Sequence, residues 1–215
     1  MATNLQDPHS RQPVLRSGAP QKDARLVAIL LHGRGASAED ILGLTAQFTA
    51  SDIAYLAPQA AGSTWYPYSF LAPFDQNAPW LDSALRLIES LLGKLRQESV
   101  PPERVVLMGF SQGACLALEF VARHAQRYAA VAAFSGGLIG PPGTPRNYAG
   151  AFEATPIFIG CSDIDPHIPL DRVRESVAVF RRMGASVDER IYPRMAHTII
   201  ADEIGAVDAM LAAKT

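Results

Sequence analysis

The sequence predicts an α/β domain built on a doubly wound, mostly parallel sheet of about six or seven strands with helices on both faces. Two observations support this fold class. Short apolar segments alternate along the chain with longer segments of helical periodicity. These apolar segments are continuous rather than alternately apolar and polar, which is typical of parallel strands buried on both faces. With 215 residues, 48% of them hydrophobic, the chain can form one sizeable core, so we expect one domain.

Six short apolar segments, each bounded by Gly, Pro or charged residues, predict the strands. They span residues 26–31, 53–57, 105–110, 129–134, 156–161 and 187–192. The polar residues 1–24 contain several prolines and predict a loose N-terminal leader, in which residues 14–17 are compatible with a short edge strand. The single domain is then expected to span residues 25–215.

Segments with helical periodicity lie between the strands and predict the helices. They span residues 38–50, 81–98, 112–124, 170–183 and 199–212. The second is the clearest, because Leu81, Leu85 and Ile88 fall on one face and charged residues fall elsewhere. Two connections, residues 58–79 and 136–155, are long and rich in Pro, Gly and aromatic residues, which is typical of functional loops.

Composition argues against several classes of function. The formal net charge of -2 and the pI of about 6.2 do not fit the basic surface that nucleic-acid binding needs. Wholly apolar stretches such as residues 26–31 are far shorter than the ~20 residues that cross a bilayer, and the N-terminus lacks a signal-peptide pattern. We therefore expect a soluble, cytoplasmic protein without stable membrane insertion. Cys115 and Cys161 are expected to be buried free thiols, and neither a metal nor another cofactor is expected.

Residues 105–114 contain the most informative pattern of the chain. An apolar strand runs directly into Ser111, which has Gly109 and Gly113 two residues away on either side. This pattern is typical of a nucleophile elbow, a strained strand-to-helix turn that closes only if its neighbours are nearly without side chains. The sequence therefore predicts Ser111 as a catalytic nucleophile, against the alternative of a plain strand-loop-helix connection.

A serine nucleophile requires a histidine that accepts its proton and an acid that orients this histidine. His197 follows the last predicted strand and precedes the last helix, where the base is expected. His124 lies near the end of the helix that follows the elbow, where it points away from the serine. We therefore predict His197 as the general base.

The acid is expected after the strand at residues 156–161, where two aspartates compete. Asp165 begins the segment Asp-Pro-His-Ile-Pro, whose prolines can restrict the turn and aim the carboxylate. Asp163 lies nearer the strand end and is the alternative, with a role in accepting backbone NH groups as the simpler interpretation. We favour Asp165, and interpret His167 as a loop or pocket-rim residue.

Attack on a carbonyl creates an oxyanion, which backbone NH groups must stabilise. Gln112, directly after the nucleophile, is predicted to supply one NH. Arg34, in the glycine-containing loop after an early strand, is predicted to supply the other. A dinucleotide-binding loop is the competing interpretation of residues 33–38, but the third glycine of that fingerprint is missing. The Arg34 side chain is expected to be solvated or to contact an anionic part of the substrate.

Together, these motifs resemble the phospholipase/carboxylesterase family of α/β hydrolases, which includes acyl-protein thioesterases and small bacterial carboxylesterases. The resemblance depends on four segments in family order, residues 31–35, 109–114, 165–169 and 195–197. It implies the α/β-hydrolase fold and cofactor-free hydrolysis of carboxylic esters or thioesters. The family pattern Asp-x-x-Val-Pro falls on Asp165 with Ile168 in place of Val, whereas the usual spacing from Gly160 selects Asp163. Both aspartates therefore stay open at this point.

The aromatic loop at residues 63–73 resembles a bacterial branch of the family. Trp65, Tyr66 and Phe70 are candidate substrate-pocket residues, and the alternative is that they attach the loop to the core. As pocket residues, they would favour short-chain or aromatic esters over long acyl chains.

The predicted function is therefore a serine carboxylesterase that acts on small or apolar acyl or aryl esters through an acyl-enzyme. Its expected partner is a small-molecule ester and not a nucleic acid, and a homodimer is compatible with the sequence. The alternatives are an acyl-protein thioesterase or lysophospholipase, a dienelactone-hydrolase-like enzyme of aromatic degradation, and, least favoured, a non-catalytic binding protein. Dienelactone hydrolases normally have a cysteine nucleophile, and Cys115 lies one helical turn beyond Ser111, too far to replace it.

Overall fold

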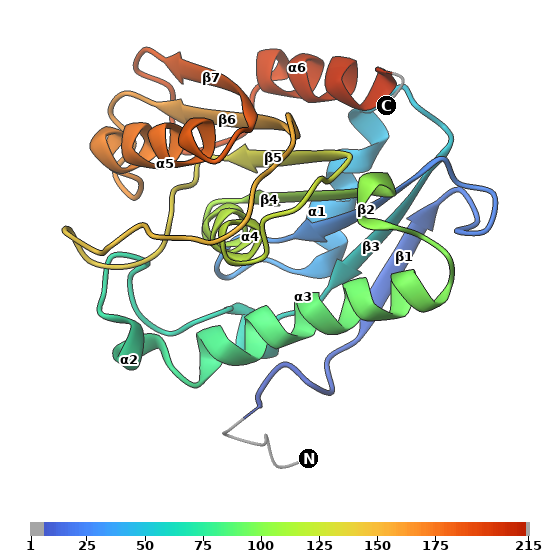
Figure 1. The fold of residues 1–215 in the computed structure, drawn as a ribbon, viewed down its shortest axis with the longest axis horizontal. Coiled ribbons are helices and arrows are strands. Elements are labelled where there is room, and N and C mark those ends of the chain that lie inside the picture. Colours follow the sequence, from blue (N-terminus) through green and yellow to red (C-terminus); the bar gives the residue numbers. More distant parts are fainter. Residues whose placement is uncertain (1–6, 214–215) are drawn as a thin grey trace.

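The computed structural model describes residues 7–213, in which seven strands form one sheet (Figure 1). The strand order is β1-β3-β2-β4-β5-β6-β7, and every neighbouring pair is parallel except β1 and β3. The strands are β1 Val14–Gly18, β2 Leu26–Leu31, β3 Ile53–Pro58, β4 Val105–Phe110, β5 Ala130–Phe134, β6 Pro156–Ser162 and β7 Ser186–Tyr192. The fold class predicted from the sequence is confirmed, and the six predicted strands begin and end within one residue of the observed bounds.

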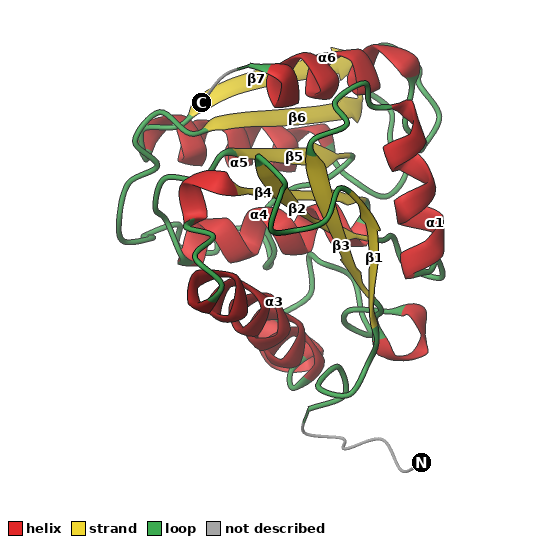
Figure 2. Cartoon of the chain, turned by 90° about the vertical axis from the view of Figure 1, so that its right-hand side faces the viewer, coloured by secondary structure: helices red, strands yellow, loops and turns green. Residues whose placement is uncertain are grey.

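Helices cover both faces of the sheet (Figures 1 and 2). They are α1 Ala38–Gly43, α2 Phe74–Asn77, α3 Trp80–Gln97, α4 Gln112–Arg123, α5 Leu170–Arg182 and α6 Ala201–Ala212. Alternate residues of β2 show the two layers, because Val27 and Ile29 pack in the core beneath α3, α4 and α5, whereas Ala28 and Leu30 pack in the core beneath α1 and α6. Among the described residues, no helix combines the length and apolar composition that a membrane span requires.

The helix predicted at residues 38–50 is shorter than expected. Helix α1 ends at Gly43 and continues only as a 3-10 turn, Leu44–Gln47, after which Phe48 is extended. The Thr45 hydroxyl donates to the Leu42 carbonyl, and Thr49 bonds Asp208 of α6 through both its NH and its hydroxyl. Local side-chain bonding and a distant partner therefore compete with the helix, which periodicity alone does not reveal.

The prediction of a loose leader at residues 1–24 is wrong for its described part, residues 7–24. The edge strand considered at residues 14–17 is present as β1, which pairs antiparallel with β3. His9 is fully buried, where its Nδ1 accepts the Ala61 NH at 3.1 Å and its Nε2 donates to the Trp65 carbonyl at 3.0 Å. These partners are more than 50 residues away, so a polar, proline-containing segment gave no local sign of them. Residues 1–6 lie outside the described residues.

Helix α6 buries a carboxyl group against the sheet. Glu203 is fully buried, its Oε2 accepts the Ile200 NH at 3.0 Å, and its Oε1 has no partner within the described residues. Gly160 of β6 leaves the space for it, since a Cβ there would come within 2.2 Å of Oε1. Burial disfavours the charged form and raises the pKa of Glu203 from its ordinary 4.5 to about 7.

This raised pKa predicts a specific pH dependence of stability. Between about pH 4.5 and about pH 7 the unfolded chain releases a proton that folded Glu203 retains, so this group destabilises the fold as the pH rises. Relative to wild type, Glu203→Gln is expected to gain about 2.5 kcal/mol of unfolding free energy between pH 5 and pH 8. Urea unfolding of both proteins at the two pH values measures this gain, and a constant difference between them would contradict the assignment.

Candidate active site

The candidate site lies where the strand order reverses. From β2, the chain first adds β3 on one side and then returns to add β4 on the other, so the loops after β2 and β4 leave neighbouring strand ends. Leu31, at the end of β2, pairs with Gly109 near the end of β4. The loop that begins at His32 therefore lies beside Ser111, at the position where open α/β sheets bind their ligands.

Ser111 occupies a strained turn between β4 and α4. Its φ of 54° and ψ of -117° lie outside the regions that side chains ordinarily adopt. The turn requires its two glycines, because a Cβ at Gly109 would come within 2.5 Å of the Gly113 backbone and a Cβ at Gly113 within 2.1 Å of the Leu31 carbonyl oxygen. The backbone therefore has the form of the elbow that the sequence predicts.

Three side chains from three different loops form a continuous hydrogen-bond chain. The distance from Ser111 Oγ to His197 Nε2 is 2.8 Å, and that from His197 Nδ1 to Asp165 Oδ2 is 2.6 Å. Ser111 follows β4, Asp165 follows β6, and His197 follows β7. If the ring is neutral with its proton on Nδ1, it donates to the carboxylate and accepts from the serine hydroxyl.

The Asp165 side chain is fully buried, and both of its carboxylate oxygens have hydrogen-bond partners. Its Oδ1 accepts the NH groups of His167 at 2.8 Å and Ile168 at 3.0 Å, while Oδ2 faces His197. Burial by itself would raise the pKa of Asp165, but the hydrogen bonds from His197 and the two NH groups outweigh it, and the pKa is lowered. The carboxylate is therefore charged at neutral pH and aimed at the imidazole.

Asp163 has a different set of contacts. It is exposed, and its Oδ1 accepts the Arg194 NH at 2.7 Å, which braces the turn after β7. Of the two aspartates that the sequence left open, the structure thus brings Asp165 to His197. His124 lies at the far end of α4, stacked on Phe120.

Two backbone NH groups near the serine are candidates for an oxyanion site. Within residues 7–213, no hydrogen bond uses the backbone NH of Arg34 or that of Gln112. Gly33 keeps the Arg34 loop close to the serine, because a Cβ at Gly33 would come within 3.6 Å of Ser111 Cβ. Gln112 is held in place by its side chain, which accepts the Trp65 NH at 2.9 Å and donates to the Tyr66 carbonyl at 2.8 Å.

The Arg34 side chain is exposed, and its guanidinium also has hydrogen-bond partners that the sequence did not suggest. It donates to the carbonyls of Pro67 at 2.8 Å and Tyr68 at 2.6 Å, and thereby fixes the aromatic loop over the site. The expected solvent exposure of Arg34 is confirmed, and its contact with an anionic part of a substrate stays a prediction. Carbonyl oxygens 33 and 34 residues away were its partners, and sequence spacing does not reveal them.

A cavity of about 510 Å³ opens at Ser111 and His197. Tyr66 and Phe70 line it, as predicted, but Trp65 does not. Trp65 is fully buried, donates from Nε1 to the His32 carbonyl at 2.8 Å, and packs against the rings of His32 and His9. It attaches the loop to the core, so the prediction of Trp65 as a pocket residue was wrong.

Phe110 and Ile168 line the cavity although the sequence did not identify them as pocket residues, and His167 lines it as a pocket-rim residue would. The Phe110 ring packs against the His197 ring at a tilt of 35°, with centroids 5.0 Å apart, and the His167 ring approaches the same imidazole edge-on at 4.8 Å. Phe110 immediately precedes the nucleophile, and this position alone could have placed it beside the serine. Ile168 completes this wall of the cavity.

Both cysteines are free and buried, as predicted. Cys115 lines the cavity, and burial raises its pKa to about 12. Its thiol therefore stays protonated at neutral pH and is not the nucleophile that a dienelactone-type enzyme would use. Within the described chain, no three His, Cys, Asp or Glu side chains gather in a group that could hold a metal ion.

Comparison with known proteins gives consistent likenesses. The phospholipase/carboxylesterase family model matches residues 16–214. A phospholipase/carboxylesterase from Dyadobacter fermentans has a similar structure, with a TM-score of 0.91 and 44% identity over 94% of this chain and 97% of the other. Acyl-protein thioesterase 1 from Saccharomyces cerevisiae is 26% identical over 212 residues, which cover 88% of this chain and 93% of the yeast protein.

A further relative is matched only in part. NocK from Nocardia uniformis subsp. tsuyamanensis, which is named as an esterase, is 34% identical over 160 residues. The match covers 72% of this chain but only 44% of NocK, so this chain spans less than half the length of that relative.

Proposed function

Because the chain belongs to the phospholipase/carboxylesterase family of α/β hydrolases, we propose that it is a serine carboxylesterase that works through an acyl-enzyme. Its substrates are carboxylic esters or thioesters with small or apolar acyl or aryl groups. The observation that supports this most strongly is the hydrogen-bond chain from Ser111 through His197 to Asp165, at 2.8 Å and 2.6 Å.

In the proposed mechanism, Ser111 Oγ attacks the ester carbonyl while His197 Nε2 accepts its proton. The oxyanion is stabilised by the NH groups of Arg34 and Gln112. Protonated His197 then donates to the leaving oxygen or sulfur, the bond to the leaving group breaks, and the acyl group stays on Ser111. Water attacks this acyl-enzyme by the same steps. Asp165 keeps the imidazole in the productive tautomer and stabilises its charged form.

The acyl-enzyme can be tested by measuring how its acyl group is divided between water and methanol. Phenyl and p-nitrophenyl butyrate give the same acyl-enzyme, so in the presence of methanol both should yield the same ratio of butyric acid to methyl butyrate. Gas chromatography of the products measures the ratio. A ratio that depends on the leaving group, or no hydrolysis of either ester, would contradict the proposal.

A second candidate is a thioesterase acting on acylated proteins. The likeness to yeast acyl-protein thioesterase 1 along 88% of the chain supports it. Such a substrate needs room for a long acyl chain. A palmitoyl thioester hydrolysed with a higher kcat/KM than a butyryl thioester would favour this candidate over a small-ester carboxylesterase.

A further inference from the structure

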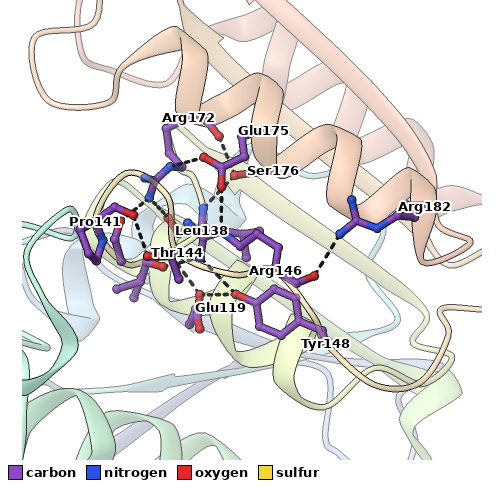
Figure 3. Close-up of polar contacts among 12 residues, drawn as sticks. Glu119, Leu138, Pro141, Thr144, Arg146, Tyr148, Arg172, Glu175, Ser176 and Arg182 are labelled. Carbon is purple, nitrogen blue, oxygen red and sulfur yellow. Dashed lines mark hydrogen bonds and ion pairs between the residues drawn. The ribbon is translucent and has the colours of Figure 1, made fainter.

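A largely buried ionic cluster, shown in Figure 3, takes no part in the proposed mechanism. It consists of Glu119 of α4, Arg146 of the loop after β5, and Arg172 and Glu175 of α5. Arg146 and Arg172 donate from Nε to the two oxygens of Glu175, at 2.8 Å and 2.9 Å. Both arginines are at least nine-tenths buried, and Glu119 is 1% exposed. The cluster's four residues are not among those that line the cavity.

The side chains of the cluster form hydrogen bonds with one short segment of backbone, residues 138–140. Arg172 Nη1 donates to the carbonyls of Leu138 at 2.7 Å and Gly140 at 2.6 Å. Arg146 Nη1 donates to the Ile139 carbonyl at 2.6 Å, and Glu119 Oε2 accepts the Ile139 NH at 3.1 Å. Charged side chains therefore bind this segment at every residue.

The same loop contacts two residues that line the cavity. The Gly140 NH donates to the Phe70 carbonyl at 2.8 Å, and the Gly137 NH lies 3.4 Å from the Cys115 sulfur. The Arg172 guanidinium lies 6.0 Å from the centre of the Phe70 ring. Residues 137–140 thus form a layer between the ionic cluster on one side and Phe70 and Cys115 on the other.

This layer is difficult to displace. An acyl chain that pushed past Phe70 or Cys115 would have to move residues 138–140, and would separate the buried Arg146, Arg172 and Glu119 from their backbone partners. A buried charge without its partner destabilises a protein by more than the burial of a few methylene groups stabilises a complex. Burial alone would raise the pKa of Glu175, but its bonds to Arg146 and the charge of Arg172 lower it, so Glu175 is charged at neutral pH.

We propose that the ionic cluster closes the inner end of the cavity and thereby restricts the acyl group to short chains. This inference rests on the proposed function and adds the residues that set its specificity. Arg172 and Glu175 act through residues 138–140. They limit how far Phe70 and Cys115 can move to make room for a longer acyl chain.

The test compares kcat/KM for p-nitrophenyl butyrate and p-nitrophenyl decanoate. For the wild type, the decanoate value is expected to be at least about 50-fold lower, because several methylenes find no space. Arg172→Met combined with Glu175→Gln removes one cation and one anion and frees the carbonyls of residues 138 and 140. The decanoate-to-butyrate ratio should then rise at least about tenfold, while the butyrate value changes less than about threefold.

A matched control joins the same helix to strand β7. Arg181 of α5 and Glu189 of β7 form an ion pair at 3.3 Å, and neither lines the cavity, so Arg181→Met with Glu189→Gln makes the same change of charge away from it. This control should leave the ratio unchanged. Arg172→Lys is a milder second variant, because an ammonium group cannot bind both carbonyls and Glu175 in the planar arrangement of a guanidinium, and it should shift the ratio in the same direction.

The outcomes separate this inference from the proposed function. A wild-type ratio near one, with hydrolysis that disappears in Ser111→Ala, overturns the chain-length inference and leaves the esterase proposal standing. A ratio that stays at the wild-type value in both cluster variants, when they are folded by circular dichroism, also overturns it. Hydrolysis that persists undiminished in Ser111→Ala contradicts the proposed function itself.

Discussion

Replacing Ser111 by alanine is expected to lower kcat for p-nitrophenyl butyrate by at least about 10⁴-fold, because the covalent route disappears. The remaining rate would come from substrate binding and from the NH groups of Arg34 and Gln112 acting on a water attack. A stopped assay with high protein concentration can measure this residual rate. Retention of more than about a tenth of the wild-type kcat would show that Ser111 is not the nucleophile.

The loss of kcat in Ser111→Ala must be distinguished from a loss of activity caused by misfolding. Alanine keeps the Cβ of Ser111 and the strained φ of 54°, so the melting temperature should change little. Ser83→Ala is the matched control, since Ser83 is a buried serine of α3 whose hydroxyl bonds the His9 NH and not the cavity. It should retain kcat within about threefold, whatever its effect on stability.

Asp165→Asn is expected to lower kcat by about 10³-fold to 10⁴-fold. An amide at this position can present an NH₂ group to His197 Nδ1, which favours the tautomer with its proton on Nε2, where it cannot accept from Ser111. The 2.6 Å contact between His197 Nδ1 and Asp165 Oδ2 is the basis of this prediction. Steady-state kinetics with p-nitrophenyl butyrate measure the loss.

Asp163→Asn is the matched control for this prediction, since it makes the same chemical change two residues away. Its remaining oxygen can still accept the Arg194 NH, so kcat should fall less than about tenfold. If Asp163→Asn were the slower variant, the acid would have to be reassigned to Asp163.

The parts of the site that sequence could predict are those with local causes. Ser111 was identified because a strand, two glycines and a helix lie within ten residues, and each is required by the geometry of one turn. His197 followed from its order in the chain. The turn after Asp165 is also local and favoured Asp165 over Asp163, but the choice depends on which carboxylate contacts His197, 32 residues away, and the sequence does not show this.

Two of the wrong predictions concern contacts between distant segments. Trp65 was assigned to the pocket because it is aromatic, yet its neighbours His9 and His32 hold it in the core. The leader was expected to be loose because its own composition is polar, whereas His9 finds its partners in the loop after β3. Tertiary contacts of this kind override local propensity and have no signature at a fixed spacing.

The most direct test of the account is to identify the residue that reacts with a fluorophosphonate. This reagent forms a stable adduct with a serine that is activated by a neighbouring base. We expect one adduct per chain, located by peptide mass spectrometry on Ser111 and absent from Ser111→Ala. If the folded protein remained unmodified, or carried its adduct on another residue, the proposal that Ser111 is an activated nucleophile would be contradicted.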